Sequence, residues 1–181
     1  MNLASSKIVV FCDASYANLT DGGSQGGRII FLCDSFGRCC PVSWCSRRIK
    51  RVARSTLSAE TQAAVEALDA AYMLKRLISE LLGIDPDVEL FTDNKSMIDA
   101  INTTNLMVDK RLRVDIAALR EMNENNEVCF KWIDSKNQVA DVLTKQGSSK
   151  QLLMKILNSC CLQRKKRVEK VCFCYQCFFM C

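Results

Sequence analysis

Five short hydrophobic runs, each bounded by turn-forming residues, give the chain its main pattern. β-Branched and aromatic residues are frequent in them, which favours buried strands. The runs are 7–11 (KIVVF), 28–33 (RIIFLC), 39–45 (CCPVSWC), 88–92 (VELFT) and 127–133 (EVCFKWI). Glycine-containing loops at 20–27 and 35–37 join the first three runs. This arrangement predicts an antiparallel meander.

Other segments repeat apolar residues at helical spacing instead. A long helix is expected over 57–82, because Ser55 and Thr56 can cap its start and Gly83 can end it. Further helices are expected over 96–102, over 110–123, and from 137 to 145 with an extension or restart to about 157. The order β-β-β-α-β-α-α-β-α predicts an α/β fold with a mixed sheet and helices packed on its faces.

The composition fits a soluble globular domain and excludes several kinds of chemistry. The 181 residues carry a net charge of +5, which permits a polyanionic partner without requiring one. The N-terminal sequence has no signal-peptide pattern, and no stretch reaches the roughly 20 apolar residues of a membrane span. We therefore expect a protein that is neither secreted nor bound in a membrane. The absence of histidine excludes Ser–His and Cys–His catalysis and histidine-ligated zinc.

The chain divides into an expected domain over 1–158 and a basic, cysteine-rich tail over 159–181, which we expect to be poorly ordered. Cys172, Cys174, Cys177 and Cys181 offer four thiols, enough for a zinc site, but their irregular spacing favours an extension without metal. The segment 164–167 (RKKR) either binds nucleic acid, acts as a nuclear import signal or is a solvated link.

Four acidic residues stand at the ends of the expected elements. Asp13 follows the first strand and Asp93 follows the fourth, so both emerge at one sheet edge if these strands are parallel neighbours. Glu60 lies in the first turn of the long helix, on the side that faces the sheet, and Asp141 begins the last helix between apolar residues. Each acid alone could also be a capping or solvated carboxylate.

Converging carboxylates repel one another, and protons or bound cations relieve the repulsion. Their oxygens are hard ligands that suit Mg²⁺. Two such ions about 4 Å apart can activate water and stabilise the leaving oxygen of a phosphodiester, with no need for histidine. We therefore expect a site for two Mg²⁺ ions, replaceable by Mn²⁺, formed by Asp13, Glu60, Asp93 and Asp141.

Six segments resemble the ribonuclease H domain of copia-type LTR retrotransposon polyproteins, which follows the reverse transcriptase. They are 11–17 (FCDASYA), 42–46 (VSWCS), 58–60 (SAE), 92–96 (TDNKS), 111–116 (RLRVDI) and 138–145 (QVADVLTK), of which the last is the most specific. Their order and spacing cover about 7–158. The resemblance implies a ribonuclease H-like fold whose strands four and five run parallel to strand one, with helices on both faces. It also implies the same four acids as metal ligands.

The resemblance further implies hydrolysis of the RNA strand of RNA–DNA hybrids during reverse transcription. The expected partner is the reverse transcriptase domain of the same polyprotein, and the expected location is a cytoplasmic retroelement particle, with the nucleus as the alternative. Gln62 and Arg113 stand where the family often has an acid and a histidine. These departures leave the expected metal ligands intact, but they concern residues that could affect the turnover rate. Two alternatives stay open: a weak or inactive nucleic-acid-binding module, and another two-metal nuclease of the same superfold.

Basic residues flank the expected site and are candidates for phosphate contacts. One group precedes the helix of Glu60 and the other begins a later helix; the residues are Arg47, Arg48, Lys50, Arg51, Lys110, Arg111 and Arg113. Asn94 could orient a water or touch phosphate. The alternatives are exposed helix faces for the cations and a helix N-terminus for Asn94. Trp44 and Trp132 lie in expected strands, where core packing is favoured over base stacking.

Overall fold

The strands form because alternate residues of each hydrophobic run pack on opposite faces of one sheet. The computed structural model describes residues 6–103 and 109–162. In β1 (Lys7–Ser15), Ile8 and Val10 face one side of the sheet, while Val9 and Phe11 face the other. Two separate hydrophobic clusters therefore lie on the two faces of the sheet.

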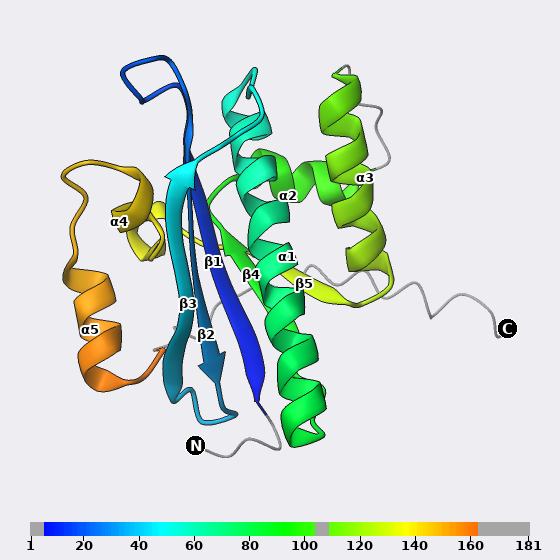
Figure 1. Ribbon diagram of the computed structural model, residues 1–181, viewed down its shortest axis with the longest axis vertical. Helices are drawn as coiled ribbons and strands as arrows, with labels where there is room; N and C mark the ends of the chain where they lie inside the picture. Colours follow the sequence, from blue (N-terminus) through cyan, green and yellow to red (C-terminus); the bar gives the residue numbers. More distant parts are fainter. Residues whose placement is uncertain (1–5, 104–108, 163–181) are drawn as a thin grey trace, which may run out of the picture.

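The sheet has five strands in the order β3-β2-β1-β4-β5 (Figure 1). β1 pairs antiparallel with β2 (Gln25–Cys33), which pairs antiparallel with β3 (Cys39–Arg48). On the other side, β1 pairs parallel with β4 (Asp87–Thr92), which pairs parallel with β5 (Val128–Trp132). The predicted meander and the predicted parallel strands are confirmed.

Three helices cover one face of the sheet. They are α1 (Thr56–Leu82), α2 (Lys95–Asn102) and α3 (Lys110–Glu124). The Ser55 hydroxyl caps α1 by accepting a hydrogen bond from the Ser58 backbone, and Gly83 ends it in the left-handed conformation with φ 64°. These boundaries agree closely with the helices expected from the sequence.

The opposite face is covered by short C-terminal elements, α4 (Asp141–Thr144) and α5 (Gln151–Ser159), and a 3₁₀ turn, η2, precedes them over Ser135–Asn137. The prediction of one helix from residue 137 to 145 is wrong in detail. Gln138 and Lys145 adopt extended conformations, and Gly147 has φ 79°, so the chain turns repeatedly instead of continuing one helix.

Two further expectations differ from the structure. Residues 25–27, expected to be part of a turn, begin β2 and pair with residues 46–48 of β3. Gly27 is needed there because a Cβ would lie 2.7 Å from Thr144 and 2.8 Å from Leu143 of the helix packed above it. Trp44 and Trp132, expected in the core, are 66% and 40% exposed.

The C-terminal part of the described chain lies along the outer edge of β3. The Cys39 amide donates a hydrogen bond to the Cys160 carbonyl, and the Leu162 amide donates one to the Gly37 carbonyl. The domain boundary at residue 158 stays a prediction, while the four cysteines considered as zinc ligands and the segment 164–167 lie outside the described residues. No helix in the described part of the chain is long and apolar enough to cross a bilayer.

Candidate metal centre

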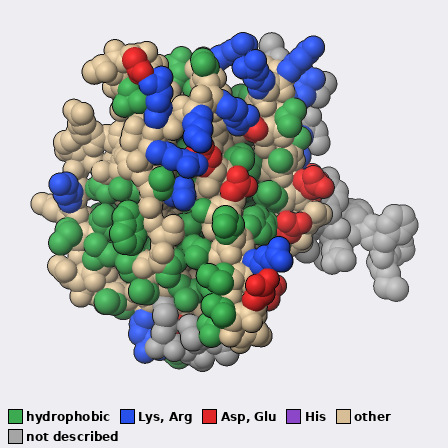
Figure 2. Space-filling model, in the orientation of Figure 1, with side chains coloured by type: hydrophobic (Ala, Val, Ile, Leu, Met, Phe, Trp, Pro, Cys, Tyr) green, Lys and Arg blue, Asp and Glu red, His purple; other side chains and the backbone are tan. Residues whose placement is uncertain are grey.

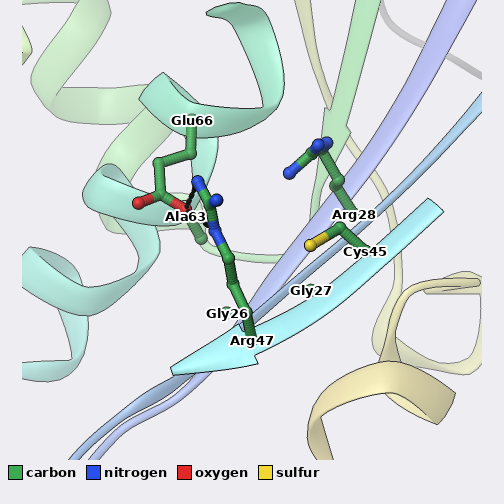
Figure 3. A pocket seen from close by; sticks show the side chains of 7 residues that line it. All are labelled: Gly26, Gly27, Arg28, Cys45, Arg47, Ala63 and Glu66. Carbon is green, nitrogen blue, oxygen red and sulfur yellow. Dashed lines mark hydrogen bonds and ion pairs between the residues drawn. The ribbon is translucent and has the colours of Figure 1, made fainter. Parts of the chain in front are cut away.

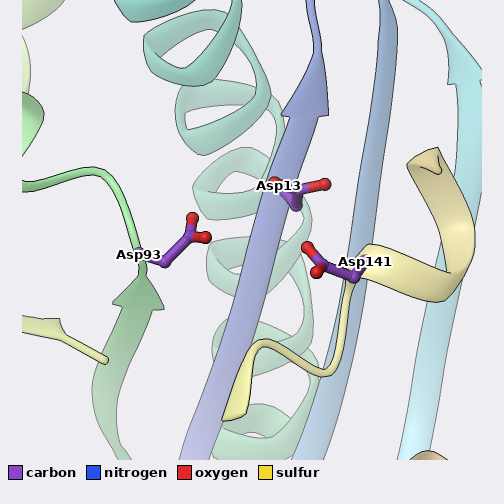
Figure 4. A group of neighbouring side chains, drawn as sticks. All are labelled: Asp13, Asp93 and Asp141. Atoms are coloured by element: carbon purple, nitrogen blue, oxygen red, sulfur yellow. The ribbon is translucent and has the colours of Figure 1, made fainter. Parts of the chain in front are cut away.

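Three aspartates from distant parts of the chain meet at one edge of the sheet. Asp13 is near the end of β1, Asp93 directly follows β4, and Asp141 is the first residue of α4. One carboxylate oxygen from each lies within 4.8 Å of the others. Figure 4 shows the three side chains directed toward the space between these elements. The structure thus brings together three of the four acids expected to bind metal.

Asp13 is the most enclosed of the three, with a side chain that is 0% exposed. The Thr144 hydroxyl donates a hydrogen bond to Oδ2, and the Lys145 ammonium lies 3.3 Å from Oδ1. Burial raises the pKa of Asp13 to about 6, and Asp141 and Asp93 add to this rise, while Thr144 and Lys145 oppose it. Asp13 is therefore ionised at neutral pH, although less firmly than an exposed aspartate.

Asp93 is positioned by residues at and after the end of the neighbouring strand. The Ser135 hydroxyl donates to its carboxylate at 2.7 Å, and the Trp132 indole N–H donates to its backbone carbonyl at 3.0 Å. The Lys95 ammonium lies 4.5 Å from the centre of the Trp132 ring. Trp132 and Ser135 thus hold the aspartate in place, a role that no pattern in the sequence indicates.

Glu60, the fourth expected ligand, is the fifth residue of α1 and is only 5% exposed. Its Oε2 atom is buried and has no hydrogen-bond partner within the described residues. Burial, reinforced by Asp13 and Asp93, raises the pKa of Glu60 to about 9, although Lys145 and a backbone hydrogen bond from Ala14 lower it. Glu60 therefore interacts electrostatically with Asp13 and Asp93 and carries a proton at neutral pH.

Asp141 is placed by the loop that precedes α4. The buried Gln138 donates to the Cys12 carbonyl of β1 at 2.9 Å and accepts from the Ala140 amide at 3.3 Å. These bonds fix the loop beside the strand that carries Asp13. Asp141 also accepts a 2.8 Å hydrogen bond from Lys145, which contacts two of the three aspartates.

Comparisons with known proteins agree with this geometry. No protein-family model matches the chain. The chain is 30% identical over 141 residues to the Gag-Pol polyproteins of transposons Ty1-NL2 and Ty1-DR6 of Saccharomyces cerevisiae. The match covers 77% of this chain but only 8% of those polyproteins.

Three solved structures, two of them ribonucleases H, share the fold at lower sequence identity. LC11-RNase H1 in complex with an RNA/DNA hybrid superimposes with a TM-score of 0.58 at 19% identity, over 81% of this chain and 99% of that one. RNase H1 from the archaeon Halobacterium salinarum gives a TM-score of 0.57 at 20% identity, over 82% of this chain and 98% of that one. A foamy viral protease-reverse transcriptase in complex with double-stranded DNA gives a TM-score of 0.51 at 15% identity, over 82% of this chain and 97% of that one.

The chain is a ribonuclease H-like domain related to LTR-retrotransposon polyproteins. The predicted fold and the predicted resemblance at this level are confirmed. The copia type and the roles of the individual site residues stay predictions.

The acids of this ribonuclease H-like domain fit a hard divalent cation. Three carboxylates offer oxygens at close range, and the buried, unpartnered oxygen of Glu60 adds a fourth potential donor. An unpartnered buried carboxyl oxygen is costly in a folded protein, so a ligand that it can bind is the simplest account of it. Asp13, Glu60, Asp93 and Asp141 could hold Mg²⁺ or Mn²⁺ together.

Three of the expected phosphate-binding residues are engaged with acids of the domain. Arg51 contacts Asp115 at 2.7 and 3.3 Å, and Arg48 pairs with Asp21. Arg47 pairs with Glu66 at 2.9 Å beside a small pocket lined by Gly26, Gly27, Arg28, Cys45 and Ala63 (Figure 3). Each of these arginines remains about half exposed, so it can still reach an anion.

The other expected contacts are exposed or serve the fold. Lys50, Lys110, Arg111 and Arg113 are exposed. Asn94 caps α2, because its side-chain oxygen accepts a 3.0 Å hydrogen bond from the Met97 amide. This contact agrees with the helix N-terminus considered as the alternative for Asn94.

The two basic groups of the ribonuclease H-like domain meet in space. Arg51 and Arg54, which precede α1, line one pocket together with Arg111 of α3. Ser58 and Gln62 of α1 form part of the same pocket, and both are buried. Figure 2 shows Lys and Arg side chains gathered on the upper part of this face, where α1 and α3 begin, with acidic side chains among them.

Proposed function

We propose that the domain hydrolyses the RNA strand of RNA–DNA hybrids, using two Mg²⁺ ions held by Asp13, Glu60, Asp93 and Asp141. The observation that carries this proposal is the convergence of three aspartate oxygens within 4.8 Å at the edge of a ribonuclease H-like sheet. The buried, unpartnered oxygen of Glu60 beside them supports it.

Each acid has a definite part in this proposal. The carboxylates of Asp13, Asp93 and Asp141 would attract divalent cations, and Glu60 would lose its proton on becoming a ligand. The bound ions would activate a water and stabilise the oxygen that leaves the RNA phosphate. Thr144, Ser135 and Trp132 hold the aspartates in position through the hydrogen bonds described above.

The basic surface gives the domain a way to hold a nucleic acid beside these acids. The pocket that joins Arg51, Arg54 and Arg111 lies next to the first turns of α1, the helix that carries Glu60. Phosphate contacts from these side chains would position the duplex without reading its sequence. Lys50, Lys110 and Arg113 are exposed, and they would also attract the phosphate backbone of the nucleic acid, although dissolved salt weakens this attraction. LC11-RNase H1, which shares the fold, is bound to an RNA/DNA hybrid in its crystal structure.

The proposed setting is a retroelement polyprotein of the copia type. The 30% identity to Ty1 Gag-Pol polyproteins supports it, and the chain spans about 8% of their length. In this setting the domain acts beside a reverse transcriptase domain, inside a cytoplasmic particle, with the nucleus as a second possible place of action. The hybrid that it cuts would be the product of that reverse transcription.

The decisive experiment measures cleavage of three labelled substrates in Mg²⁺: an RNA–DNA hybrid, an RNA duplex and a DNA duplex. We expect cleavage of the hybrid's RNA strand alone, and none in EDTA. Asp93→Asn removes one ligand charge and should lower the rate more than the about 10–100-fold that outer-shell substitutions typically cost. Asp99→Asn, the same chemical change at an exposed position of α2, is the matched control and should retain the wild-type rate.

Other outcomes point to the alternatives. A folded protein that binds the hybrid but cuts nothing in Mg²⁺ or Mn²⁺ is a nucleic-acid-binding module, and the proposal is then wrong. Cleavage of the DNA duplex at a rate equal to that of the hybrid would instead assign a different two-metal nuclease on the same fold.

A further inference from the structure

Lys145 places a positive charge inside the carboxylate cluster. Its ammonium lies 2.8 Å from Oδ1 of Asp141 and 3.3 Å from Oδ1 of Asp13. The backbone of Lys145 is fixed at the end of α4, where its amide donates to the Asp141 carbonyl at 2.9 Å. The short helix α4 therefore delivers both an acid and a cation to the same place.

This contact differs from an ordinary surface ion pair. An exposed lysine four residues from an aspartate on one helix contributes little. Lys145, however, also contacts Asp13, which is 132 positions away in the sequence and whose side chain is 0% exposed. A cation beside a fully enclosed carboxylate is screened less by solvent than one on the surface. Lys145 thus acts on the cluster as a whole.

The ammonium and a divalent cation compete for the same two carboxylates, those of Asp13 and Asp141. Lys145 donates to Oδ1 of both Asp13 and Asp141, two of the three aspartates whose oxygens converge. A metal ion bound by these aspartates would compete for their lone pairs, and two cations so close together repel each other. The lysine side chain is 41% exposed and flexible, so it can leave toward solvent.

We propose that Lys145 is a resident counter-ion of the acidic cluster, which a divalent metal must displace in order to bind. This inference rests on the proposed metal-dependent function and adds a residue that sets metal affinity. Without metal, Lys145 offsets the repulsion among the aspartates and keeps α4 beside β1. When a metal ion binds, the ammonium of Lys145 leaves the aspartates and moves toward solvent.

The test is a calorimetric titration of metal-free protein with Mn²⁺. Lys145→Met removes the competing charge and should tighten Mn²⁺ binding about tenfold, within the roughly 5–150-fold range typical of coupled binding events. Lys145→Arg keeps the charge and should bind with about wild-type affinity. Lys155→Met, the same change at an exposed position of α5, is the matched control and should leave the affinity unchanged.

Thermal unfolding supplies a second readout that does not depend on metal titration. In EDTA, Lys145→Met should unfold at a lower temperature than the wild type, because the aspartates lose their counter-ion. Saturating Mn²⁺ should remove or reverse this difference, since the tighter-binding variant gains more from the ligand. Lys145→Gln serves as a second neutral variant if the methionine variant does not fold.

The outcomes separate the inference from the function on which it rests. Equal or weaker Mn²⁺ binding by both neutral variants overturns the role of Lys145 while the proposed metal site stands. If neither the wild type nor Asp93→Asn binds Mn²⁺, both the proposed metal-dependent function and the role of Lys145 are wrong.

Discussion

At the scale of the residue, Glu60 combines deep burial with a raised pKa. It is 5% exposed, and its pKa is about 9 in the folded chain against 4.5 for an unperturbed glutamate. Between these two values, the unfolded chain has released the proton while the folded chain retains it. The stabilisation is therefore complete below about pH 4.5 and is lost as the pH rises toward 9.

We predict that the metal-free protein becomes less stable as the pH rises from 6.5 to 7.5. One retained proton corresponds to at most about 1.4 kcal/mol per pH unit, or a fall in Tm of at most about 3–6 °C. The chain contains no histidine, and Asp13, whose pKa is about 6, is already mostly ionised at pH 6.5, so Glu60 dominates the change in this interval. Differential scanning calorimetry in EDTA measures the effect.

Glu60→Gln is the matched control, because its amide has nearly the same shape and does not titrate. Its Tm should be nearly constant over the same pH unit. A wild-type Tm that rises with pH, or a slope that persists in the glutamine variant, would show that Glu60 does not retain its proton.

The positions of the four acids could be predicted from the sequence, because Asp13 and Asp93 lie at or near the ends of strands, and Glu60 and Asp141 lie at or near the starts of helices. Their neighbours could not be predicted in the same way. Thr144 and Lys145 reach Asp13 across more than 130 positions of sequence, and Trp132 reaches Asp93 from another strand. Such contacts depend on how the elements pack, which periodicity along the chain does not record.

At the scale of the element, the single turn of α4 carries more of the site than any other segment. It supplies Asp141, Thr144 and, at its end, Lys145. The helix lies directly on Gly27 of β2, where a Cβ would approach Thr144 within 2.7 Å and Leu143 within 2.8 Å. The absence of a side chain at Gly27 is what allows this close approach.

We predict that Gly27→Ala displaces α4 and impairs the site. Overpacking of this kind typically costs about 1–3 kcal/mol, and the shift moves Thr144 and Asp141 away from Asp13. The variant should therefore bind Mn²⁺ more weakly in calorimetry and cut the hybrid more slowly than the wild type.

Gly26→Ala provides the comparison, because it adds the same methyl group one position earlier. Its Cβ would meet the buried side chain of Ile49 at 3.2 Å and Ala63 at 3.6 Å, and none of its three nearest atoms belongs to α4. It should keep its metal affinity even if it loses some stability. Equal metal affinity in both variants would mean that α4 does not depend on the gap at Gly27.

The elements themselves were predictable to different degrees. The long α1 has a capping serine, a terminal glycine and a long apolar stripe, and its predicted bounds agree with the structure within one residue. The C-terminal elements have weaker signals. Asn137–Lys145 has helical spacing, yet tertiary contacts of Gln138 with β1 hold that part of the chain in an extended form.

At the scale of the whole molecule, residues 160–162 lie against the outer edge of β3. Arg38 and Cys161 form an antiparallel bridge, flanked by the hydrogen bonds from Cys39 and Leu162. An uncovered edge strand offers free backbone groups to other chains, which promotes aggregation. The segment thus protects one end of β3 even though the sequence placed it in a tail.

We predict that a chain ending at residue 158 is less stable than one ending at residue 162. The two lost backbone hydrogen bonds account for about 2 kcal/mol, which lowers Tm by about 4–8 °C. The shorter chain should also scatter more light as concentration rises. Identical melting curves and scattering for the two chains would place the end of the domain at residue 158, as the sequence suggests.

The three aspartates of the metal centre come from the beginning, the middle and the end of the domain. A ribosome therefore releases the first two long before it has made Asp141, and no shorter nascent chain holds the complete set. If the proposed function is correct, the domain stays harmless while it is being translated and becomes a nuclease only once its last helices have folded against the sheet.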